Sequence, residues 1–251
     1  MQQYFVEEVI DSNASIFILH DSQLRHHLIK VLRMHENEQC LLVDQAANTF
    51  LATLKSTDEE ITFEISLKED VIDVEFPVES VIACSLSKKD KLEWIAQKST
   101  ELGAKRILFF NSKYSVKKWD SKIATKKISR IQEIVKNAAQ QSHRQMIPQV
   151  EYLESLPELI KKTADYSVKL VAYEEVAKAG QPSNLASAIN QVATNQKVVC
   201  LFGPEGGFDK FEIELLNENG FLSVGLGPRI LRAETAPLYF LSTLSYKFDL
   251  M

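Results

Sequence analysis

The chain has 251 residues, of which 45% are hydrophobic and 25% charged, and its formal net charge is −5. This composition excludes a disordered chain and is typical of a soluble protein with one large or two modest domains. No apolar run approaches the roughly 20 residues of a membrane span, and the N-terminus lacks the pattern of a signal peptide. Three scattered cysteines, Cys40, Cys84 and Cys200, indicate reduced thiols in a cytoplasm without a Cys-x-x-Cys zinc site.

The first third of the chain contains short β-rich runs separated by polar turns: YFVEEV, SIFIL, QCLLVDQ, TFLATLKS and ITFEISLKE. One amphipathic helix interrupts them, LRHHLIKVLR. Many short strands at close spacing predict a small barrel. The polar stretch from Asp70 to Pro77 ends this pattern, so we expect one domain over residues 1–72 and a second over 73–251.

Strands and helices alternate in the second domain. The apolar runs SVIACSL, RILFF, KLVAY, KVVCLF and LSVGLG predict strands. Helices are expected over KKDKLEWIAQKSTELG, over residues 122–142, around LPELIKKT and LASAINQV, and over DKFEIELLNEN. The last of these begins with Asp209 and Glu212 at capping-box spacing and stops at Gly220. Alternation of this kind predicts an α/β fold with a parallel sheet covered on both faces.

A basic segment lies in the middle of this domain, although the whole chain is acidic. From Lys113 to Arg130 there are seven basic residues against Asp120 alone. The segment is either a solvated helix face or a surface that contacts nucleic-acid phosphates, with Tyr114 and Trp119 available for stacking.

Three expected strands end in unusual loops, which are AYEE, GPEGGF and GPRILRAETA. Ligands of open α/β sheets bind beyond the carboxyl ends of the strands, so the three loops predict one pocket. GPEGGF is not followed by Gly-Lys-Ser/Thr and does not match G-x-G-x-x-G, which argues against a nucleotide phosphate site. Its glycines either allow backbone to approach a ligand closely or only form a turn.

The paired sequences FGPEGGF and LGPRILRAETAP resemble the signatures of the RsmE family, within the SPOUT class of RNA methyltransferases. Three further segments, HHLIKVLR, DKLEWIAQKSTELGA and NAAQQSHRQMIP, look like other motifs of this family, in the same order. Together they cover both expected domains.

The resemblance implies a PUA-like RNA-binding barrel followed by a SPOUT domain with a C-terminal trefoil knot. It also implies S-adenosyl-L-methionine as the cofactor, bound at a homodimer interface of the C-terminal domain. The implied substrate is N3 of uracil 1498 in 16S ribosomal RNA, free or in the small ribosomal subunit. The alternatives are a SPOUT methyltransferase for another RNA, such as transfer RNA, and a non-catalytic ribosome-binding factor.

The three loops supply the expected cofactor-binding residues. These are Ala172, Tyr173, Glu174, Phe202, Gly203, Pro204, Glu205, Gly206, Gly207, Leu226, Gly227, Ile230, Leu231, Thr235 and Ala236. Thr235 also fits the N-cap of the last helix. Glu205 either accepts hydrogen bonds from backbone N–H groups of its loop or contacts the substrate.

The expected catalytic residues are Arg232, Glu234 and Arg229. Uridine N3 is a poor nucleophile while protonated, so the site must stabilise the uracil anion. Arg232 or Arg229 could lie against the uracil carbonyls, where negative charge develops. Glu234 could accept the proton or orient an arginine.

The expected RNA contacts are His27, Arg33, Lys117, Lys118, Lys122, Arg130 and Arg144. Five histidines without partners at ligand spacing indicate no metal site. The sequence departs from the family pattern at Gln2, Gln3 and Gln140, in the turn ENEQ after VLRMH, and in NSKY at residues 111–114. We expect these departures to affect the RNA surface more than the cofactor loops.

Overall fold

The computed structural model describes residues 1–251 except 59, 88, 116–117 and 176–183. It divides into two compact units. The first consists of Met1–Val74 and Ala139–Met146, and the second of Glu75–Ala138 and Ile147–Met251. The short segment 139–146 therefore belongs with the N-terminal residues, although it begins in the last turn of the long helix over Ser121–Gln141.

The first unit contains a five-stranded mixed sheet in the order β1-β3-β4-β5-β2. The strands are β1 (Gln3–Phe5), β2 (Ile16–Leu19), β3 (Gln39–Val43), β4 (Thr49–Ser56) and β5 (Ile61–Leu67). β1 pairs with β3 in parallel, and the other pairs are antiparallel. Alternate side chains of β4 and β5 enter the core, where Phe50, Phe63 and Leu54 are fully buried. The sequence period of two thus gives a sheet with one packed face.

The predicted helix between β2 and β3 is confirmed in two parts, α1 (Ser22–His26) and the π-helix η1 (His27–Val31). Asp21 caps α1, because its carboxylate accepts from the backbone N–H groups of Gln23 and Leu24. In the turn ENEQ, Asn37 adopts a φ of 69°. Asparagine tolerates this left-handed conformation better than most residues, so it replaces a turn glycine here.

The second unit contains six parallel strands in the order β11-β9-β10-β6-β7-β8. The strands are β6 (Glu79–Ser85), β7 (Arg106–Phe110), β8 (Gln149–Leu153), β9 (Val168–Ala172), β10 (Lys197–Phe202) and β11 (Leu222–Val224). All five predicted strands are present, and β8 is the sixth. The central strands β6 and β10 are almost entirely buried, as in parallel sheets covered on both faces.

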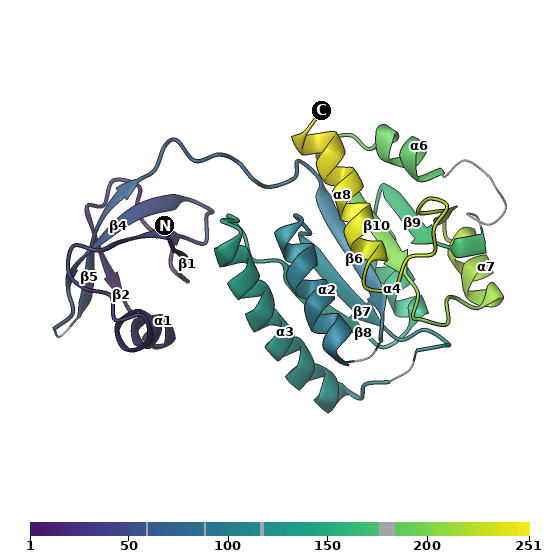
Figure 1. Ribbon diagram of the computed structural model, residues 1–251, viewed down its shortest axis with the longest axis horizontal. Coiled ribbons are helices and arrows are strands. Elements are labelled where there is room, and N and C mark those ends of the chain that lie inside the picture. Colours follow the sequence, from purple (N-terminus) through teal and green to yellow (C-terminus); the bar gives the residue numbers. More distant parts are fainter. Residues whose placement is uncertain (59, 88, 116–117, 176–183) are drawn as a thin grey trace. The chain divides into compact units, whose positions relative to one another are not determined.

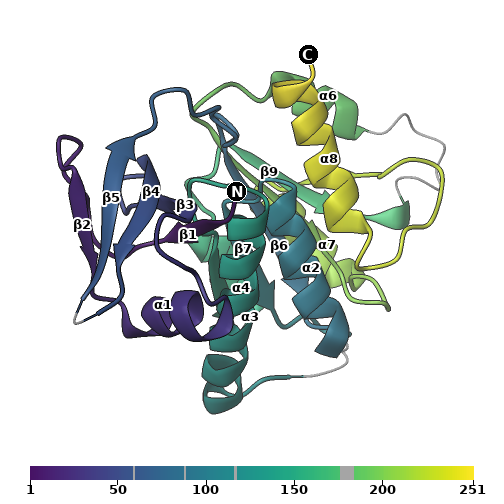
Figure 2. The ribbon, with the colours of Figure 1, turned by 60° about the vertical axis from the view of Figure 1, so that its left-hand side comes forward.

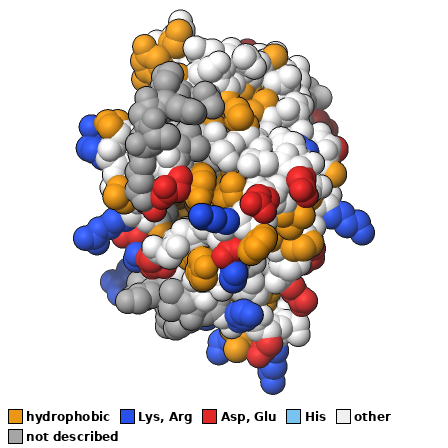
Figure 3. Space-filling model, turned by 90° about the vertical axis from the view of Figure 1, so that its right-hand side faces the viewer, with side chains coloured by type: hydrophobic (Ala, Val, Ile, Leu, Met, Phe, Trp, Pro, Cys, Tyr) orange, Lys and Arg blue, Asp and Glu red, His pale blue; other side chains and the backbone are white. Residues whose placement is uncertain are grey.

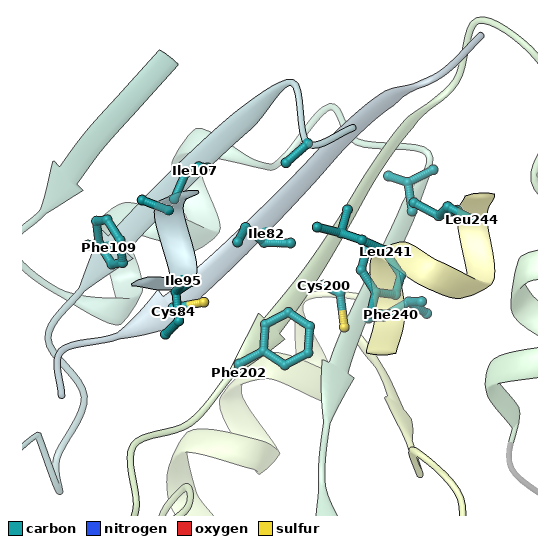
Figure 4. Close-up of a cluster of buried hydrophobic side chains, with 14 of the residues drawn as sticks. Ile82, Cys84, Ile95, Ile107, Phe109, Cys200, Phe202, Phe240, Leu241 and Leu244 are labelled. Carbon is teal, nitrogen blue, oxygen red and sulfur yellow. The ribbon is translucent and has the colours of Figure 1, made fainter. Parts of the chain in front are cut away.

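Helices cover both faces of this sheet (Figure 1). The helices are α2 (Lys89–Glu101), α3 (Ser121–Gln141), α4 (Leu156–Lys162), α6 (Asn184–Gln191), α7 (Lys210–Glu218) and α8 (Ala236–Asp249). One core contains residues of α2, α3, α6 and α8, and the other contains residues of α4 and α7. In the first core, Phe240, Leu241 and Leu244 of α8 pack towards Cys200 and Phe202 of β10 (Figure 4).

The predicted helix boundaries at three glycine and cap positions are confirmed. Asp209 and Glu212 form a capping box at the start of α7. Gly220 follows the end of α7 with a φ of 81°, and Gly103 follows α2 with a φ of 86°. Both glycines take the left-handed conformation that ends a helix at little cost only in glycine.

All three cysteines are free and buried. Burial raises the pKa of the Cys40 thiol to about 12 and raises the pKa values of Cys84 and Cys200 further. Among the described residues, no helix combines the length and the apolar character that crossing a membrane requires.

Candidate functional site

The loops that follow β9, β10 and β11 line one cavity of about 630 Å³. β9 pairs with both β10 and β11, so the three carboxyl ends are adjacent at one edge of the sheet. The loops thus meet because the strands are parallel and neighbouring, although the strand ends at Ala172, Phe202 and Val224 are 30 and 22 positions apart along the chain.

Most of the predicted cofactor and catalytic residues line this cavity. The lining contains Ala172, Tyr173, Glu174, Phe202, Gly203, Pro204, Glu205, Gly206, Gly207, Leu226, Gly227, Arg229, Ile230, Leu231, Arg232 and Ala236. Glu234 and Thr235 are not part of the lining. Thr235 occupies the N-cap position of α8, as predicted, but its side chain makes no capping hydrogen bond.

Lys91, which the sequence did not indicate, also lines the cavity. It lies in the first turn of α2, and its Nζ is 3.0 Å from Glu205 Oε1 and 2.9 Å from Glu234 Oε2. Glu205 belongs to the loop after β10 and Glu234 to the loop after β11. One lysine therefore connects two of the three loops through ion pairs whose side chains are 18% to 33% exposed.

The two ion pairs set the charges of the site. The hydrogen bonds to Glu234 and Glu205 raise the pKa of Lys91 above its ordinary 10.5. Burial by itself raises the pKa of Glu234, but the hydrogen bond from Lys91 and the charges of Lys91 and Arg232 bring this pKa below 4.5. At neutral pH the lysine is protonated and the glutamate is an anion, which makes Glu234 a weak proton acceptor.

Arg229 and Arg232 present exposed side chains at the cavity. Neither guanidinium forms an ion pair with any residue that the structure describes. Of the two roles considered for Glu234, the orientation of an arginine is not seen among the described residues. Its carboxylate forms an ion pair with Lys91 instead. Both arginines remain available for a bound molecule.

Two glycine positions of GPEGGF favour a residue without a side chain, for different reasons. A Cβ atom on Gly206 would lie 3.3 Å from Cβ of Tyr114. Gly207 has a φ of 71°, which side chains of L-residues rarely adopt. A side chain at position 206 would therefore press against the segment after β7.

The segment 111–115 is bound to the start of α7. Lys113 Nζ and Tyr114 Oη each lie 2.8 Å from Asp209 Oδ2, and the Lys113 N–H donates to Glu212. These bonds lower the pKa of Asp209. The departure NSKY therefore does not concern the RNA surface alone, because Lys113 and Tyr114 also contact the cap of the helix that follows GPEGGF.

The predicted RNA residues differ in exposure. His27, Arg33, Lys118 and Lys122 are exposed, and Lys117 lies outside the described residues. Arg130 is exposed but its Nη2 is 3.0 Å from Glu93. Arg144 is only 2% exposed. This burial contradicts a surface phosphate contact for Arg144, because a phosphate cannot reach a guanidinium that solvent does not reach.

Two other residues with expected RNA roles have structural ones. Trp119 is 8% exposed and packs on Tyr152 at a ring distance of 5.4 Å, so it does not offer a free face for stacking. Gln3 is buried, and its Nε2 donates to the Arg144 carbonyl oxygen at 2.6 Å. Gln3 thereby joins β1 to the segment 139–146 within the first unit.

No cluster of three or more His, Cys, Asp or Glu side chains that could bind a metal ion occurs in the described part of the chain. The cavity walls include glycine-rich backbone, apolar side chains, Arg229, Arg232 and Lys91, together with the acidic residues Glu174, Glu175 and Glu205.

Two protein-family models match the chain. The RNA methyltransferase domain matches residues 74–245, and the RNA methyltransferase PUA domain matches residues 21–66. The ribosomal RNA small subunit methyltransferase E of Bacillus subtilis is 38% identical over 253 aligned residues, which cover 100% of this chain and 98% of that protein.

Solved structures support the same relationship. A ribosomal RNA small subunit methyltransferase E from Neisseria gonorrhoeae, bound to S-adenosyl methionine, is 28% identical with a TM-score of 0.81, over 100% of both chains. The methyltransferase Lpg2936 from Legionella pneumophila, in complex with the same cofactor, is also 28% identical with a TM-score of 0.81, over 98% of this chain and 97% of that one. The motifs, the cavity at three strand ends and these full-length matches together show that the chain belongs to the ribosomal RNA small subunit methyltransferase E family, with a PUA domain and an RNA methyltransferase domain.

Proposed function

We propose that the protein transfers the methyl group of S-adenosyl-L-methionine to N3 of a uridine in 16S ribosomal RNA, corresponding to uracil 1498. The observation that carries this proposal is the cavity at the ends of β9, β10 and β11, with Arg229 and Arg232 at its edge. The relatives bound to S-adenosyl methionine support the cofactor.

The cavity fits this cofactor in size and chemistry. Its volume of about 630 Å³ lies within the range of small-molecule sites. Phe202, Leu226 and Ile230 offer apolar contacts, and the glycine-rich backbone offers N–H and C=O groups for an adenosine and an amino-acid moiety. When bound, the cofactor supplies a methyl group on a sulfonium for in-line attack.

The residues of the chain position the methyl donor and the uridine, and they stabilise the charge that develops on the uracil. The three loops hold donor and acceptor together, which removes much of the entropic barrier. Arg232 stabilises the negative charge that develops on the uracil carbonyls as N3 loses its proton. Glu234, with its lowered pKa, acts mainly through Lys91, which fixes the loop that carries Arg232.

Replacing Lys91 with methionine is expected to raise the pKa of Glu234 relative to the wild type, because burial remains while the bonded cation is lost. In the wild type, a carboxylate with a lowered pKa stabilises the fold above about pH 4.5, and this contribution is lost as the pH falls through the lowered pKa. In Lys91→Met this contribution of Glu234 to stability is expected to be smaller. NMR titration of labelled glutamate carboxyls measures the shift.

Lys98→Met is the matched control for this experiment. Lys98 lies on the same helix and pairs with Glu101, away from the cavity. An unchanged Glu234 titration in Lys91→Met, together with unchanged cofactor affinity, would show that Lys91 does not fix these loops.

The RNA surface of the second unit includes the exposed residues Lys118 and Lys122. Replacing both with glutamine is expected to weaken RNA binding and to reduce the slope of log affinity against log salt by about one unit per lost phosphate contact. Binding isotherms at several salt concentrations measure this slope. Lys161→Gln, an exposed change on α4, is the control, and an equal slope in both variants would identify the lysines as merely solvated.

We further propose that two copies associate through the C-terminal domain and that its last loops form a trefoil knot. Exposed apolar side chains support an interface: Ile230 is 78% exposed, and Tyr239 and Tyr246 of α8 are 36% and 61% exposed. Seen from the side of α6 and α7, hydrophobic side chains lie at the surface among basic and acidic ones (Figure 3). Such patches are typical of association sites.

The proposed function is tested by mapping methylated uridines in ribosomal RNA of cells that lack the gene. We expect one N3-methyluridine of the small subunit to disappear in these cells. It should return when the purified protein and the cofactor are added to small subunits from them. We also expect the protein itself in the cytoplasmic fraction of normal cells. A modification lost from transfer RNA instead would identify another substrate. Absence of cofactor binding in a calorimeter would identify a non-catalytic ribosome-binding factor.

A further inference from the structure

A second cavity, of about 300 Å³, lies between α2 and α3. Both views show the two helices side by side (Figures 1 and 2). Its apolar walls come from Leu92 in the first turn of α2, from Ile123 and Ile131 of α3, and from Trp119. The function described above does not use this cavity.

Ser87 provides a polar group at the wall of the cavity. It follows β6, is only 3% exposed and lines the cavity. Its Oγ makes no hydrogen bond with any described residue. A buried hydroxyl without a partner costs stability, and at a cavity wall it is placed to hydrogen-bond to a bound molecule.

The charges at the cavity favour an anion. Lys118 and Lys127 line it, together with one carboxylate, that of Glu93. Arg130 neutralises this carboxylate, since its Nη2 is 3.0 Å from Glu93 Oε2. Two lysines therefore remain in excess beside an apolar interior.

The position of the cavity links it to the methyl-transfer site. Lys91 lines the first cavity, and the next two residues, Leu92 and Glu93, line the second. The same turn of α2 thus separates the two cavities. Ser87 follows the carboxyl end of β6, which pairs with β10, the strand that leads into GPEGGF.

We propose that the second cavity binds a nucleotide of the RNA substrate next to the one that is methylated. The base lies against Leu92, Ile123 and the edge of Trp119, and Ser87 Oγ hydrogen-bonds to a polar atom of this base. Lys118 and Lys127 contact the phosphate. The cavity is at the small end of the range for ligand sites, which suits one nucleotide. This proposal rests on the proposed RNA methyltransferase function.

Ser87→Ala tests the hydroxyl. We expect the KM for small subunits and the Kd for substrate RNA to rise about three- to tenfold, the cost of one hydrogen bond, with kcat and cofactor affinity unchanged. The melting temperature should stay equal or rise, because the variant removes an unpaired buried hydroxyl. A purely structural role predicts the opposite, a lower melting temperature with unchanged KM.

Ser99→Ala is the matched control for this variant. Ser99 lies on α2, is fully buried, and its Oγ likewise has no partner among the described residues, but it does not line the cavity. We expect the same thermal behaviour and no change in KM. Equal RNA affinity in the two alanine variants would overturn the proposal.

Lys127→Gln tests the phosphate contact, with Lys136→Gln on the same helix as control. Only the first is expected to reduce the salt slope of RNA binding, by about one unit. Photocrosslinking of a substrate oligonucleotide that carries a reactive base beside the target uridine should label the peptide containing Trp119 or Ile123. Crosslinks confined to other peptides would also contradict the proposal.

These outcomes separate the two proposals. If the wild type does not methylate ribosomal RNA, the proposed function fails and the subsite with it. If the wild type methylates ribosomal RNA and Ser87→Ala and Lys127→Gln match their controls, only the subsite fails. The second cavity would belong to another ligand if uridine monophosphate or an apolar peptide bound there while these variants left the RNA affinity unchanged.

Discussion

Arg232→Ala should lower the turnover of methyl transfer about a hundredfold or more while the affinity for S-adenosyl-L-methionine barely changes. Arg232 lies at the cavity with an exposed side chain and without an ion-pair partner among the described residues. A group that acts only as charge develops in the transition state affects kcat and leaves ground-state binding intact. Single-turnover kinetics on small subunits and calorimetry with the cofactor measure the two quantities.

Two comparisons make this result specific. Arg232→Lys keeps the positive charge and should recover part of the rate. Arg229→Ala measures how much the neighbouring arginine at the same cavity contributes to the rate. Glu234→Gln should retain part of its activity if the carboxylate acts through Lys91, and should lose nearly all if it accepts the proton. A folded, dimeric and fully active Arg232→Ala enzyme would refute the catalytic role, and a lower melting temperature would indicate a structural one.

Gly206→Val should abolish cofactor binding without unfolding the domain. A Cβ on this glycine would lie 3.3 Å from Cβ of Tyr114, so a branched side chain must displace the GPEGGF loop from one wall of the cavity. Tyr114 cannot move freely, because its hydroxyl is bonded to Asp209 at the cap of α7. Calorimetry measures the affinity, and circular dichroism verifies that the sheet remains folded.

A second variant separates two causes of lost binding, which are displacement of the GPEGGF loop and a direct clash of the valine with the cofactor. Removing the Tyr114 side chain in the double variant Gly206→Val, Tyr114→Gly frees the space and should restore part of the binding if displacement of the loop is the cause. If the double variant binds no better than Gly206→Val, the valine itself occupies the cofactor's place. Unchanged affinity in Gly206→Val would show that the loop does not line the binding site.

The sheet of the second unit and the position of its cavity follow from the sequence because they depend on local patterns. Continuous apolar runs such as KVVCLF predict buried parallel strands, and glycine-rich sequences mark the strand ends where the loops meet. The capping box of Asp209 and Glu212 is likewise a local signal. The sequence therefore predicts most of the residues that line the cavity, which are 172–174, 202–207 and 226–231.

The residues that connect distant segments could not be found in this way. Lys91 reaches two glutamates more than 100 positions away along the chain, and a lysine in the first turn of a helix otherwise resembles any solvated residue. Tyr114 looked like a stacking residue within a basic run, but its role depends on Asp209, which tertiary packing brings close. Arg144 belongs to the segment NAAQQSHRQMIP, which resembles a family motif, and only the fold shows that it is buried.

The distribution of the thiols gives the two units separate reporters of local opening. Cys40 lies in the sheet of the first unit, whereas Cys84 and Cys200 lie on paired strands of the second. Because burial raises the pKa of each thiol, alkylating reagents that require a thiolate react only after the surrounding sheet has opened. The rate at which Cys40 is labelled therefore measures fluctuations of the PUA unit, and the labelling of Cys84 and Cys200 measures those of the methyltransferase unit, within one unmodified molecule.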